Sequence, residues 1–357
     1  MEETRTDNLK RKRRNRKILY LFLGVFLIGY TLFWKAYSDI NHTSNNIFNS
    51  LNTNNKRESQ IAIEATQPIS FAFLGIDNGS VDRSEDVGRS DAILIGTVNP
   101  NTRTTTLASI PRDTYALMVG YEPYEGMEYY DKLTHAYAFG DAEMAINSIQ
   151  ELVNIPIDYY VEVNMQGLID IVDAFGGIKV TSPLTFDYQG NYFTEGETRT
   201  INGKEALAFA RMRKTDPQGD FGRQIREKIV IKAIMDKALS LGSIANYESI
   251  LETLEDNVKT NLTISDMADM YLSYGKSLEN FNTKNLVGEE LWLEDIYYLY
   301  TYPEDRLKLS NTLPSELELE EITLEDLSLS DVDYYNYETG YFESTYSEEY
   351  YDESSEY

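Results

Sequence analysis

The chain alternates short apolar runs with longer segments whose apolar residues recur at helical spacing. Short runs rich in β-branched and aromatic residues predict strands at 69–76, 92–98, 104–110, 159–163 and 178–180. Segments with helical periodicity and capping residues predict helices at 136–153, 165–175, 205–210, 221–241 and 265–278. Because strands alternate with helices, we expect an α/β domain with a mixed central sheet sandwiched by helices.

The beginning of the chain has the pattern of a membrane anchor. Residues 10–17 are nearly all basic, and residues 18–34 form an uncharged apolar run. A run of about 17–25 apolar residues crosses a bilayer as a helix, and a basic flank stays in the cytoplasm. We therefore predict a basic cytoplasmic segment at 1–17, a transmembrane helix at 18–34 and an extracellular body. A cleaved signal peptide is the alternative, but no small-residue cleavage site follows Trp34.

Composition divides the remaining chain into four parts. Residues 35–67 are polar and rich in Asn, Ser and Thr, which predicts an extracellular stalk. Residues 68–245 contain most of the predicted elements and form the expected catalytic domain. We expect a helical portion at 246–312 that packs on this domain or extends it. Residues 313–357 lack Lys and Arg and supply more than half of the net charge of −27, so we expect a disordered acidic, Tyr-rich tail.

The composition also excludes several kinds of chemistry. The chain has no cysteine, which excludes disulfides, thiol catalysis and zinc–thiolate or iron–sulfur sites. Its only histidines are His42 and His135, so a metal site built from several histidines is excluded, and we interpret His135 as structural. The short basic N-terminus is too small for a DNA-binding domain and serves as a topology signal. We therefore expect no nucleic-acid partner.

Two carboxylates and two guanidinium groups are predicted to meet at one edge of the sheet. Asp77 ends the first predicted strand and Asp91 begins the second, so antiparallel pairing places both at the same edge. Arg89 lies beside Asp91, and the third strand returns to this edge at Arg112. Two Asp side chains suit Mg²⁺, which completes its coordination with water and substrate phosphate oxygens. The alternative is that both carboxylates only cap turns.

A basic segment in an otherwise acidic chain favours an anionic ligand. Residues 210–228 read ARMRKTDPQGDFGRQIREK and contain Arg211, Arg213, Arg223 and Arg226. Arg211 and Arg213 share a side of an extended stretch, whereas Arg223 and Arg226 share a helix face. Arginine donates paired hydrogen bonds that match phosphate, and a helix N-terminus favours anions. Surface ion pairing is the alternative, although exposed pairs contribute only about 0–1 kcal/mol each. Lys132 is a weaker candidate for anion binding.

Together these segments resemble the LytR-CpsA-Psr family of cell-wall glycopolymer ligases. The resemblance covers residues 69–241 and rests on FLGIDNG, GRSDAILIGTVNPNTRTTTLASIPRDT, KLTHAYAFGD, GLIDIVDAFGGIKV and INGKEALAFARMRKTDPQGDFGRQIREK, in family order. Two positions depart from the family pattern. Glu227 stands where many members carry Gln, and Asp141 stands where Gly is usual.

The resemblance implies a membrane-anchored extracellular enzyme of the Gram-positive type. Such an enzyme transfers a phospho-glycopolymer, such as a teichoic acid or capsule polymer, from a polyprenyl pyrophosphate carrier to the muramyl C6 hydroxyl of peptidoglycan. By resemblance, Asp77 and Asp91 hold Mg²⁺, or alternatively Mn²⁺, and the apolar carrier lies between the sheet and the helices at 142–153 and 165–175. The expected pyrophosphate ligands are Arg89, Arg112, Arg211, Arg213, Arg223 and Arg226, with Asp91, Arg89, Arg112 and Arg211 acting on the reaction itself.

Three points stay open in the sequence. The general base is either Asp91 or Asp113, and the transferred polymer is not identified. Water as acceptor would make the protein a polyprenyl-pyrophosphate hydrolase with the same site. A non-enzymatic regulator that binds a lipid-linked glycan is the second alternative.

Overall fold

The computed structural model describes residues 47–51, 56–57, 63, 67–78, 88–240 and 257–333. The predicted transmembrane helix at 18–34, much of the predicted stalk and the end of the acidic tail lie outside these residues. Among the helices that the structure describes, none has the length and apolar character needed to cross a membrane.

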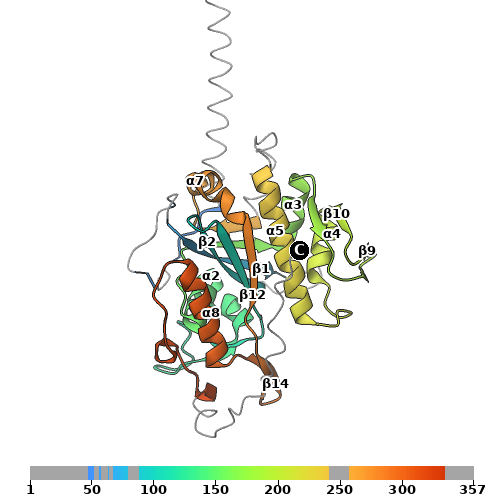
Figure 1. Cartoon of the computed structure of the whole chain (residues 1–357). Helices are drawn as coiled ribbons and strands as arrows, with labels where there is room; N and C mark the ends of the chain where they lie inside the picture. The colour runs from blue at the N-terminus through green and yellow to red at the C-terminus, as the bar shows by residue number, and fades with distance from the viewer. Residues whose placement is uncertain are drawn as a thin grey trace, which may run out of the picture.

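A six-stranded mixed sheet forms the centre of the fold (Figure 1), in the order β11-β6-β1-β2-β3-β12. All five predicted strands are confirmed. The central strands β1 (Ile69–Asp77), β2 (Arg89–Asn99) and β3 (Thr104–Ile110) pair antiparallel. The end of β1, the start of β2 and the end of β3 therefore lie at the same edge of the sheet. Strand β6 (Tyr159–Asn164) lies parallel to β1, as expected for a strand reached through a helix. The fifth predicted strand is β7 (Ile178–Thr181), which pairs outside this sheet.

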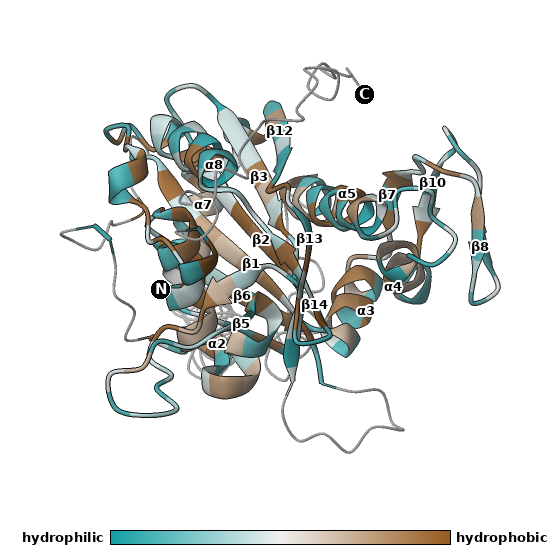
Figure 2. Ribbon diagram, turned by 90° about the horizontal axis from the view of Figure 1, so that it is seen from below, coloured by the Kyte–Doolittle hydropathy of each residue, from teal (hydrophilic) through white to brown (hydrophobic). Residues whose placement is uncertain are grey.

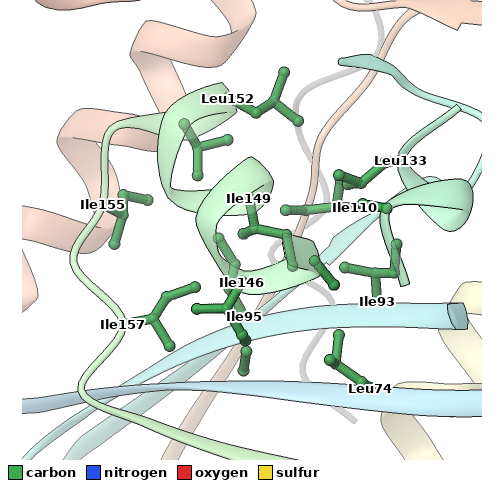
Figure 3. Close-up of a cluster of buried hydrophobic side chains, with 14 of the residues drawn as sticks. Leu74, Ile93, Ile95, Ile110, Leu133, Ile146, Ile149, Leu152, Ile155 and Ile157 are labelled. Atoms are coloured by element: carbon green, nitrogen blue, oxygen red, sulfur yellow. The ribbon is translucent and has the colours of Figure 1, made fainter. Parts of the chain in front are cut away.

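Helices cover both faces of the sheet, as the alternating pattern predicts. Helix α2 (Leu133–Val153) packs its apolar side on one face, together with α8 (Pro303–Glu316), and Figure 3 shows Ile146 and Ile149 of α2 against Ile95. On the opposite face, α5 (Asp220–Ser240) and α7 (Ile264–Tyr274) pack on residues such as Leu94 and Leu107. Most residues of β2 and β3 are buried because helices cover both faces of the sheet (Figure 2).

A second cluster of helices and short strands packs beside the sheet. Helices α3 (Met165–Ala174) and α4 (Gly203–Arg211) pack against α5 and the β7–β10 pair around Phe209, which is fully buried. Asn202 caps α4 through a capping box with Glu205, as expected. The smaller strands here and elsewhere are β4 (Tyr115–Leu117), β5 (Tyr130–Lys132), β8 (Phe186–Tyr188), β9 (Asn191–Phe193) and β10 (Thr198–Ile201).

The region at 246–312 differs from the helical portion that the sequence predicts. Its described part supplies both edge strands of the sheet, β11 (Val258–Thr260) and β12 (Asn280–Asn285). It also supplies a hairpin of β13 (Glu289–Leu293) and β14 (Ile296–Tyr300), while the expected helix at 265–278 divides into α7 and the 3-10 turn η1 (Gly275–Leu278). The edge strand β12 is polar and mostly exposed, so it lacks the apolar signal that marked the central strands.

The acidic tail also begins later than predicted. Residues 313–333 belong to the folded domain, through the end of α8 and the turn η2 (Leu324–Asp326). Leu313 and Leu317 are buried in the core under α2, and the Glu316 carboxylate accepts hydrogen bonds from Thr97 and Thr106 of the sheet. Asp333 forms a buried ion pair with Arg306 at 2.8 Å. Apolar residues spaced along this segment pack into the core despite its negative charge. The average composition of the segment does not reveal them.

Described parts of the predicted stalk contact the domain. Ile47 is fully buried, and Phe48 forms a parallel bridge with Thr260 at the β11 edge of the sheet. Arg57 forms an ion pair with the buried Asp158 at 3.2 Å. These contacts protect an edge strand that would otherwise expose unpaired backbone groups.

The ordered end of α8 can be tested with a pair of leucine variants. Leu313→Ala should lower the free energy of unfolding by about 2–5 kcal/mol, because it removes a fully buried side chain. Leu319→Ala, at an exposed position in the same segment, should change it by less than about 0.5 kcal/mol. Urea unfolding of both variants measures the difference. If both variants changed the free energy of unfolding by an equal, negligible amount, residues 313–333 would belong to the disordered tail, as first predicted.

Candidate active site

A β-bulge places Asp91 at the edge of the sheet. Along β1 and β2, Asp77 pairs with Arg89 and Ile76 with Ser90, but Gly75 pairs with Ala92. Asp91 is therefore the extra residue of the bulge, which frees its side chain from the regular alternation of the strand. Gly75 is required beside it, because a Cβ atom there would lie 2.9 Å from the Cβ of Ala92. Asp77, Arg89 and Asp91 thus meet where the sequence predicts.

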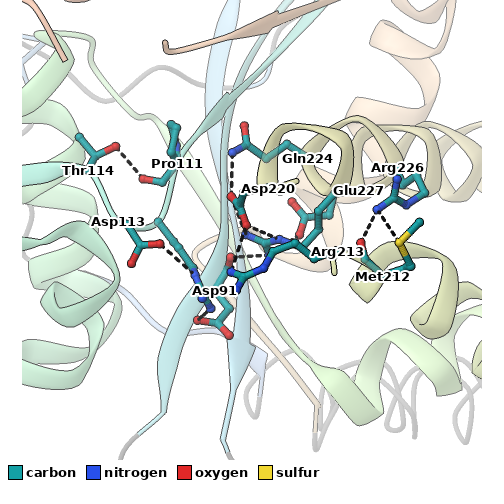
Figure 4. A network of polar contacts seen from close by, with 12 residues as sticks. Asp91, Pro111, Asp113, Thr114, Met212, Arg213, Asp220, Gln224, Arg226 and Glu227 are labelled. Carbon is teal, nitrogen blue, oxygen red and sulfur yellow. Dashed lines mark hydrogen bonds and ion pairs between the residues drawn. The ribbon is translucent and has the colours of Figure 1, made fainter. Parts of the chain in front are cut away.

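The end of β3 brings the next charged group to the same edge. Arg112 Nη1 lies 2.9 Å from Asp91 Oδ1, and its Nε lies 3.5 Å from Asp113 Oδ2. The β4–β5 pair then places Lys132 nearby, with Nζ 3.3 Å from Asp113 Oδ1. The predicted convergence of Arg112 on the carboxylates is therefore present, Lys132 lies at the same edge, and Figure 4 shows Asp91 and Asp113 there.

The basic segment faces this edge from the other side. Arg211 ends α4, and its Nη2 lies 3.6 Å from Asp77 Oδ2. Arg213 follows in the connection to α5 and lies 3.6 Å from Asp220. Arg223 of α5 donates to Asp220, Glu227 and the backbone carbonyl of Asp91, the last at 3.0 Å. Arg223 thereby fastens α5 to the bulge of β2.

Arg226 does not join this group, contrary to the prediction from helical spacing. Its guanidinium group is buried between α4 and α5, where it donates to the carbonyls of Phe209 and Met212 and pairs with Asp216. Figure 4 shows Arg226 pointing toward Met212 and away from Asp220. Arg223 and Arg226 point to different partners because the group at the sheet edge faces only a narrow side of α5. Arg226 therefore stabilises the connection that carries Arg213.

The edge of the sheet carries nearly balanced charge. We call this group the rim cluster; its basic members are Arg89, Arg112, Lys132, Arg211, Arg213 and Arg223, and its acidic members are Asp77, Asp91, Asp113, Asp220 and Glu227. The ion pairs differ in strength. The Arg211 and Arg213 side chains are 40% and 43% exposed and their pairs are long, whereas Arg223 is only 10% exposed and fully engaged. Arg211 and Arg213 can therefore turn to a bound anion at little cost.

The pKa values of the two acids on α5 shift in opposite directions, although burial alone would raise both. Burial would raise the pKa of Asp220, but the charge and hydrogen bonds of Arg223, with a hydrogen bond from Gln224, hold it below its usual value. Burial dominates at Glu227, and the negative charges of Asp220 and Asp91 add to it, so that its pKa rises to about 7 despite Arg223. The next residue, Lys228, turns to β12 and donates to the carbonyl of Lys284, and burial lowers its pKa to about 8.

The carboxylates of the rim cluster fit a hard divalent cation. Within the described residues, no group of three or more His, Asp or Glu side chains is arranged to hold a metal ion. Asp77 and Asp91 can supply two oxygen ligands, which suits Mg²⁺ because this ion keeps several waters and binds substrate phosphates. The donor set therefore matches a cation that the substrate helps to hold.

Two residues at this edge were not identified from the sequence, Asp220 and Tyr297. Asp220 pairs with two arginines, although its position at the start of α5, three residues before Arg223, was a detectable signal. Tyr297 of the β13–β14 hairpin also lies at this edge, with its ring centroid 5.7 Å from Lys132 Nζ. No motif marked it, since it lies far along the chain from the other members.

The family model of the LytR_cpsA_psr family matches residues 34–314 of the chain. The chain belongs to the LytR-CpsA-Psr family. This match extends beyond the motifs at both ends and includes the edge strands β11 and β12 and most of α8. The match therefore agrees with the place of these elements in the folded domain.

Individual family members are similar over most of their length. The polyisoprenyl-teichoic acid–peptidoglycan teichoic acid transferase TagU of Bacillus licheniformis is 39% identical over 310 residues, which cover 85% of this chain and 95% of TagU. A crystal structure described as a transcriptional regulator from Enterococcus faecalis is 37% identical, with a TM-score of 0.65 and coverage of 78% and 97%. The structure of TagT bound to LIIa-WTA is 30% identical, with a TM-score of 0.61 and coverage of 74% and 96%.

The raised pKa of Glu227 predicts a pH-dependent stability. The folded protein holds this proton up to about pH 7, whereas an unfolded glutamate releases it near 4.5. The folded state thus binds more protons in this window, so its contribution to stability is lost as pH rises from 4.5 to 7. Between pH 5 and 8, Glu227→Gln should remove a decline on the order of 1–3 kcal/mol. Unfolding measured against pH tests this, with the exposed Glu195→Gln as control; an unchanged slope in Glu227→Gln would contradict the burial argument.

Proposed function

We propose that the protein is an extracellular phosphotransferase of cell-wall biogenesis. It moves a phospho-glycopolymer from a polyprenyl pyrophosphate carrier to peptidoglycan, at the muramyl C6 hydroxyl, and wall teichoic acid is the first polymer to test. The rim cluster carries this proposal, because it gathers six basic and five acidic side chains at one sheet edge, among them Asp77 and Asp91. The names of TagU and of TagT bound to LIIa-WTA support the choice of polymer and acceptor.

The arginines have different parts in binding the diphosphate. Arg211 and Arg213 are the most available, because their ion pairs are long and partly exposed. Arg89 and Arg112 approach from β2 and from the end of β3. Arg223 acts as a positioning residue, since its donors already serve Asp220, Glu227 and the Asp91 carbonyl. Each charge-assisted hydrogen bond to phosphate contributes roughly 1.5–3 kcal/mol.

Asp77 and Asp91 would hold Mg²⁺ or Mn²⁺ at this site. When bound, the cation neutralises charge on the diphosphate oxygens and so favours the departure of the lipid phosphate. Binding it requires Asp77 and Asp91 to exchange their contacts with Arg211 and Arg112 for the metal. The released guanidinium groups are then free for the phosphates.

The transfer forms one bond and breaks one. The muramyl hydroxyl oxygen bonds to the polymer-proximal phosphorus, and the bond from that phosphorus to the bridging oxygen breaks, so that polyprenyl phosphate leaves. The hydroxyl proton passes to a carboxylate. We assign this role to Asp113, because Asp91 is occupied as a metal ligand and Asp113 is adjacent at the same edge. Arg112 and Arg211 stabilise the charge that spreads over the phosphoryl oxygens.

From the family resemblance we expect the apolar carrier to lie between the sheet and helices α2 and α3. The space under α2 is filled here by Ile146, Ile149 and their neighbours (Figure 3). Carrier binding at this position therefore requires α2 to move from the sheet. The kink within α2 at Gly140 and Asp141 is a suitable hinge, because Asp141 adopts a positive φ of 52° where the family usually has Gly.

In this proposal the chain is anchored in the cell membrane with its N-terminus inside the cell. The apolar run at 18–34 and its basic flank support this orientation. The lipid carrier then lies in the same membrane as the anchor, within reach of the catalytic domain.

An arginine pair tests the binding role directly. Arg211→Gln should lower kcat/KM for polymer transfer by about 10–100-fold, since it removes a charge-assisted contact to phosphate. Arg103→Gln, which loses an exposed ion pair with Glu279 in the β2–β3 turn, should retain native activity. Far-ultraviolet circular dichroism confirms that both variants fold. Normal transfer by Arg211→Gln would contradict the proposed site.

Transfer is distinguished from hydrolysis and from regulation by its products. The full chain in detergent, given labelled lipid-linked polymer and peptidoglycan, should produce polymer bound to the wall and release polyprenyl phosphate. Free polymer phosphate without a wall-linked product would identify a hydrolase. Binding of the lipid-linked polymer with no product would favour the regulator that the description of the Enterococcus faecalis relative suggests.

A further inference from the structure

The β13–β14 hairpin presents an exposed aromatic surface beside the rim cluster. Trp292 and Tyr297 are directly paired across the hairpin, with ring centroids 5.5 Å apart and planes at 67°. Trp292 is 61% exposed, and Ile296 at the turn is also exposed. Neighbouring exposed apolar side chains mark a binding surface more often than a single exposed residue does. We call Trp292 and Tyr297 the aromatic platform.

The platform is continuous with the candidate active site. The backbone N–H of Leu299 donates to the carbonyl of Asp113 at 2.8 Å, and Leu299 also bridges Thr114. Lys132, which pairs with Asp113, lies above the Tyr297 ring. The pKa of Tyr297 is raised by burial and then by the charge of Asp113, which agrees with this placement. Figure 2 shows β13 and β14 in front of the ends of the central strands.

The polar groups around the platform favour a sugar over a lipid surface. The turn of the hairpin consists of Glu294 and Asp295, and Glu289 and Glu290 lie on the adjacent strand. These acids are repelled by an anionic membrane but accept hydrogen bonds from hydroxyl and amide groups. An aromatic face with a negative quadrupole attracts the C–H face of a sugar ring. A glycan is therefore the occupant that fits both the rings and the acids.

The position of the platform selects the acceptor glycan over the donor. In-line phosphoryl transfer places the attacking and leaving oxygens on opposite sides of the phosphorus. Asp77 and Arg211 lie at the β1 side of the rim cluster, toward α3 and α4. Asp113 and the platform lie at the β3 side, beyond Asp91. With the lipid-side phosphate held at Arg211 and Asp77, the attacking hydroxyl approaches from the opposite side, where the hairpin lies.

We infer that Trp292 and Tyr297 form the subsite that binds the peptidoglycan glycan strand and presents its muramyl hydroxyl to Asp113. This inference rests on the proposed transferase function and assigns its acceptor site. Trp292 and Tyr297 are positioning residues, since neither contacts the reacting atoms. The C-terminal hairpin thereby contributes specificity to a reaction whose charged groups come from the rest of the domain.

Tryptophan fluorescence gives a direct test, because the chain has only two tryptophans, Trp34 and Trp292. In full-length Trp34→Phe protein in detergent, all tryptophan emission comes from Trp292. Soluble glycan strands cut from peptidoglycan should protect this emission from quenching by acrylamide. Lipid-linked polymer and phosphatidylglycerol vesicles should give no protection. Protection by the lipid-linked polymer would make the platform a donor site, protection by vesicles would make it a membrane contact, and either result overturns the inference.

Kinetics provide an independent test with a matched control. Trp292→Ala should raise the KM for the glycan acceptor about tenfold with a much smaller change in kcat, as expected for a residue that only positions the acceptor. Trp292→Phe should remain near native, which separates loss of the ring from misfolding of the hairpin. Tyr192→Ala removes a ring that is 60% exposed on β9, away from the rim cluster, and should have no effect.

The outcomes separate this inference from the function on which it rests. If the native chain transfers polymer and Trp292→Ala has a native acceptor KM, only the acceptor subsite is wrong. If the native chain forms no wall-linked product, the transferase function itself fails.

Discussion

Arg223 holds the candidate site together by joining α5 to the bulge of β2. Its guanidinium group is buried among Asp220 and Glu227 of α5 and the Asp91 carbonyl of β2, so two elements of the fold meet at one side chain. A buried charge is tolerated only with such complete pairing, and loss of one partner costs about 3–5 kcal/mol. Through this contact the connection that carries Arg213 faces the sheet edge. The position of Asp220 and the rest of α5 against Asp91 depends on it.

The remaining charges of the rim cluster form a graded set. Arg112 contacts Asp91 closely, whereas Arg211 and Arg213 hold their carboxylates at 3.6 Å near solvent. Acidic partners keep the arginines from repelling each other in the absence of substrate. The long pairs are also the easiest to exchange for phosphate, since exposed ion pairs contribute little. A site of this kind is stable when empty and retains donors that can rearrange around a diphosphate.

Local patterns predicted the parts of the fold whose burial is complete. The strands at 69–76, 92–98 and 104–110 are largely buried on both faces, and their antiparallel order places Asp77, Asp91 and Arg112 together. Local sequence patterns failed to predict positions that are determined by tertiary contacts. The polar edge strand β12 is held by pairing with β3, and Arg226 is directed inward by Asp216, which no spacing along a helix specifies. The hairpin that carries Tyr297 reaches the site only through the fold.

A crystal structure of the full chain with Mg²⁺ and a short-chain polyprenyl pyrophosphate tests the central claim most directly. The account predicts the diphosphate between Arg211 and Arg112, with a metal ion bound by Asp77 and Asp91. The cavity of about 260 Å³ beside Arg226 and Asp216 offers a different location on the far side of α5. A diphosphate bound there, with the contacts of Asp77 and Asp91 unchanged, would contradict the account.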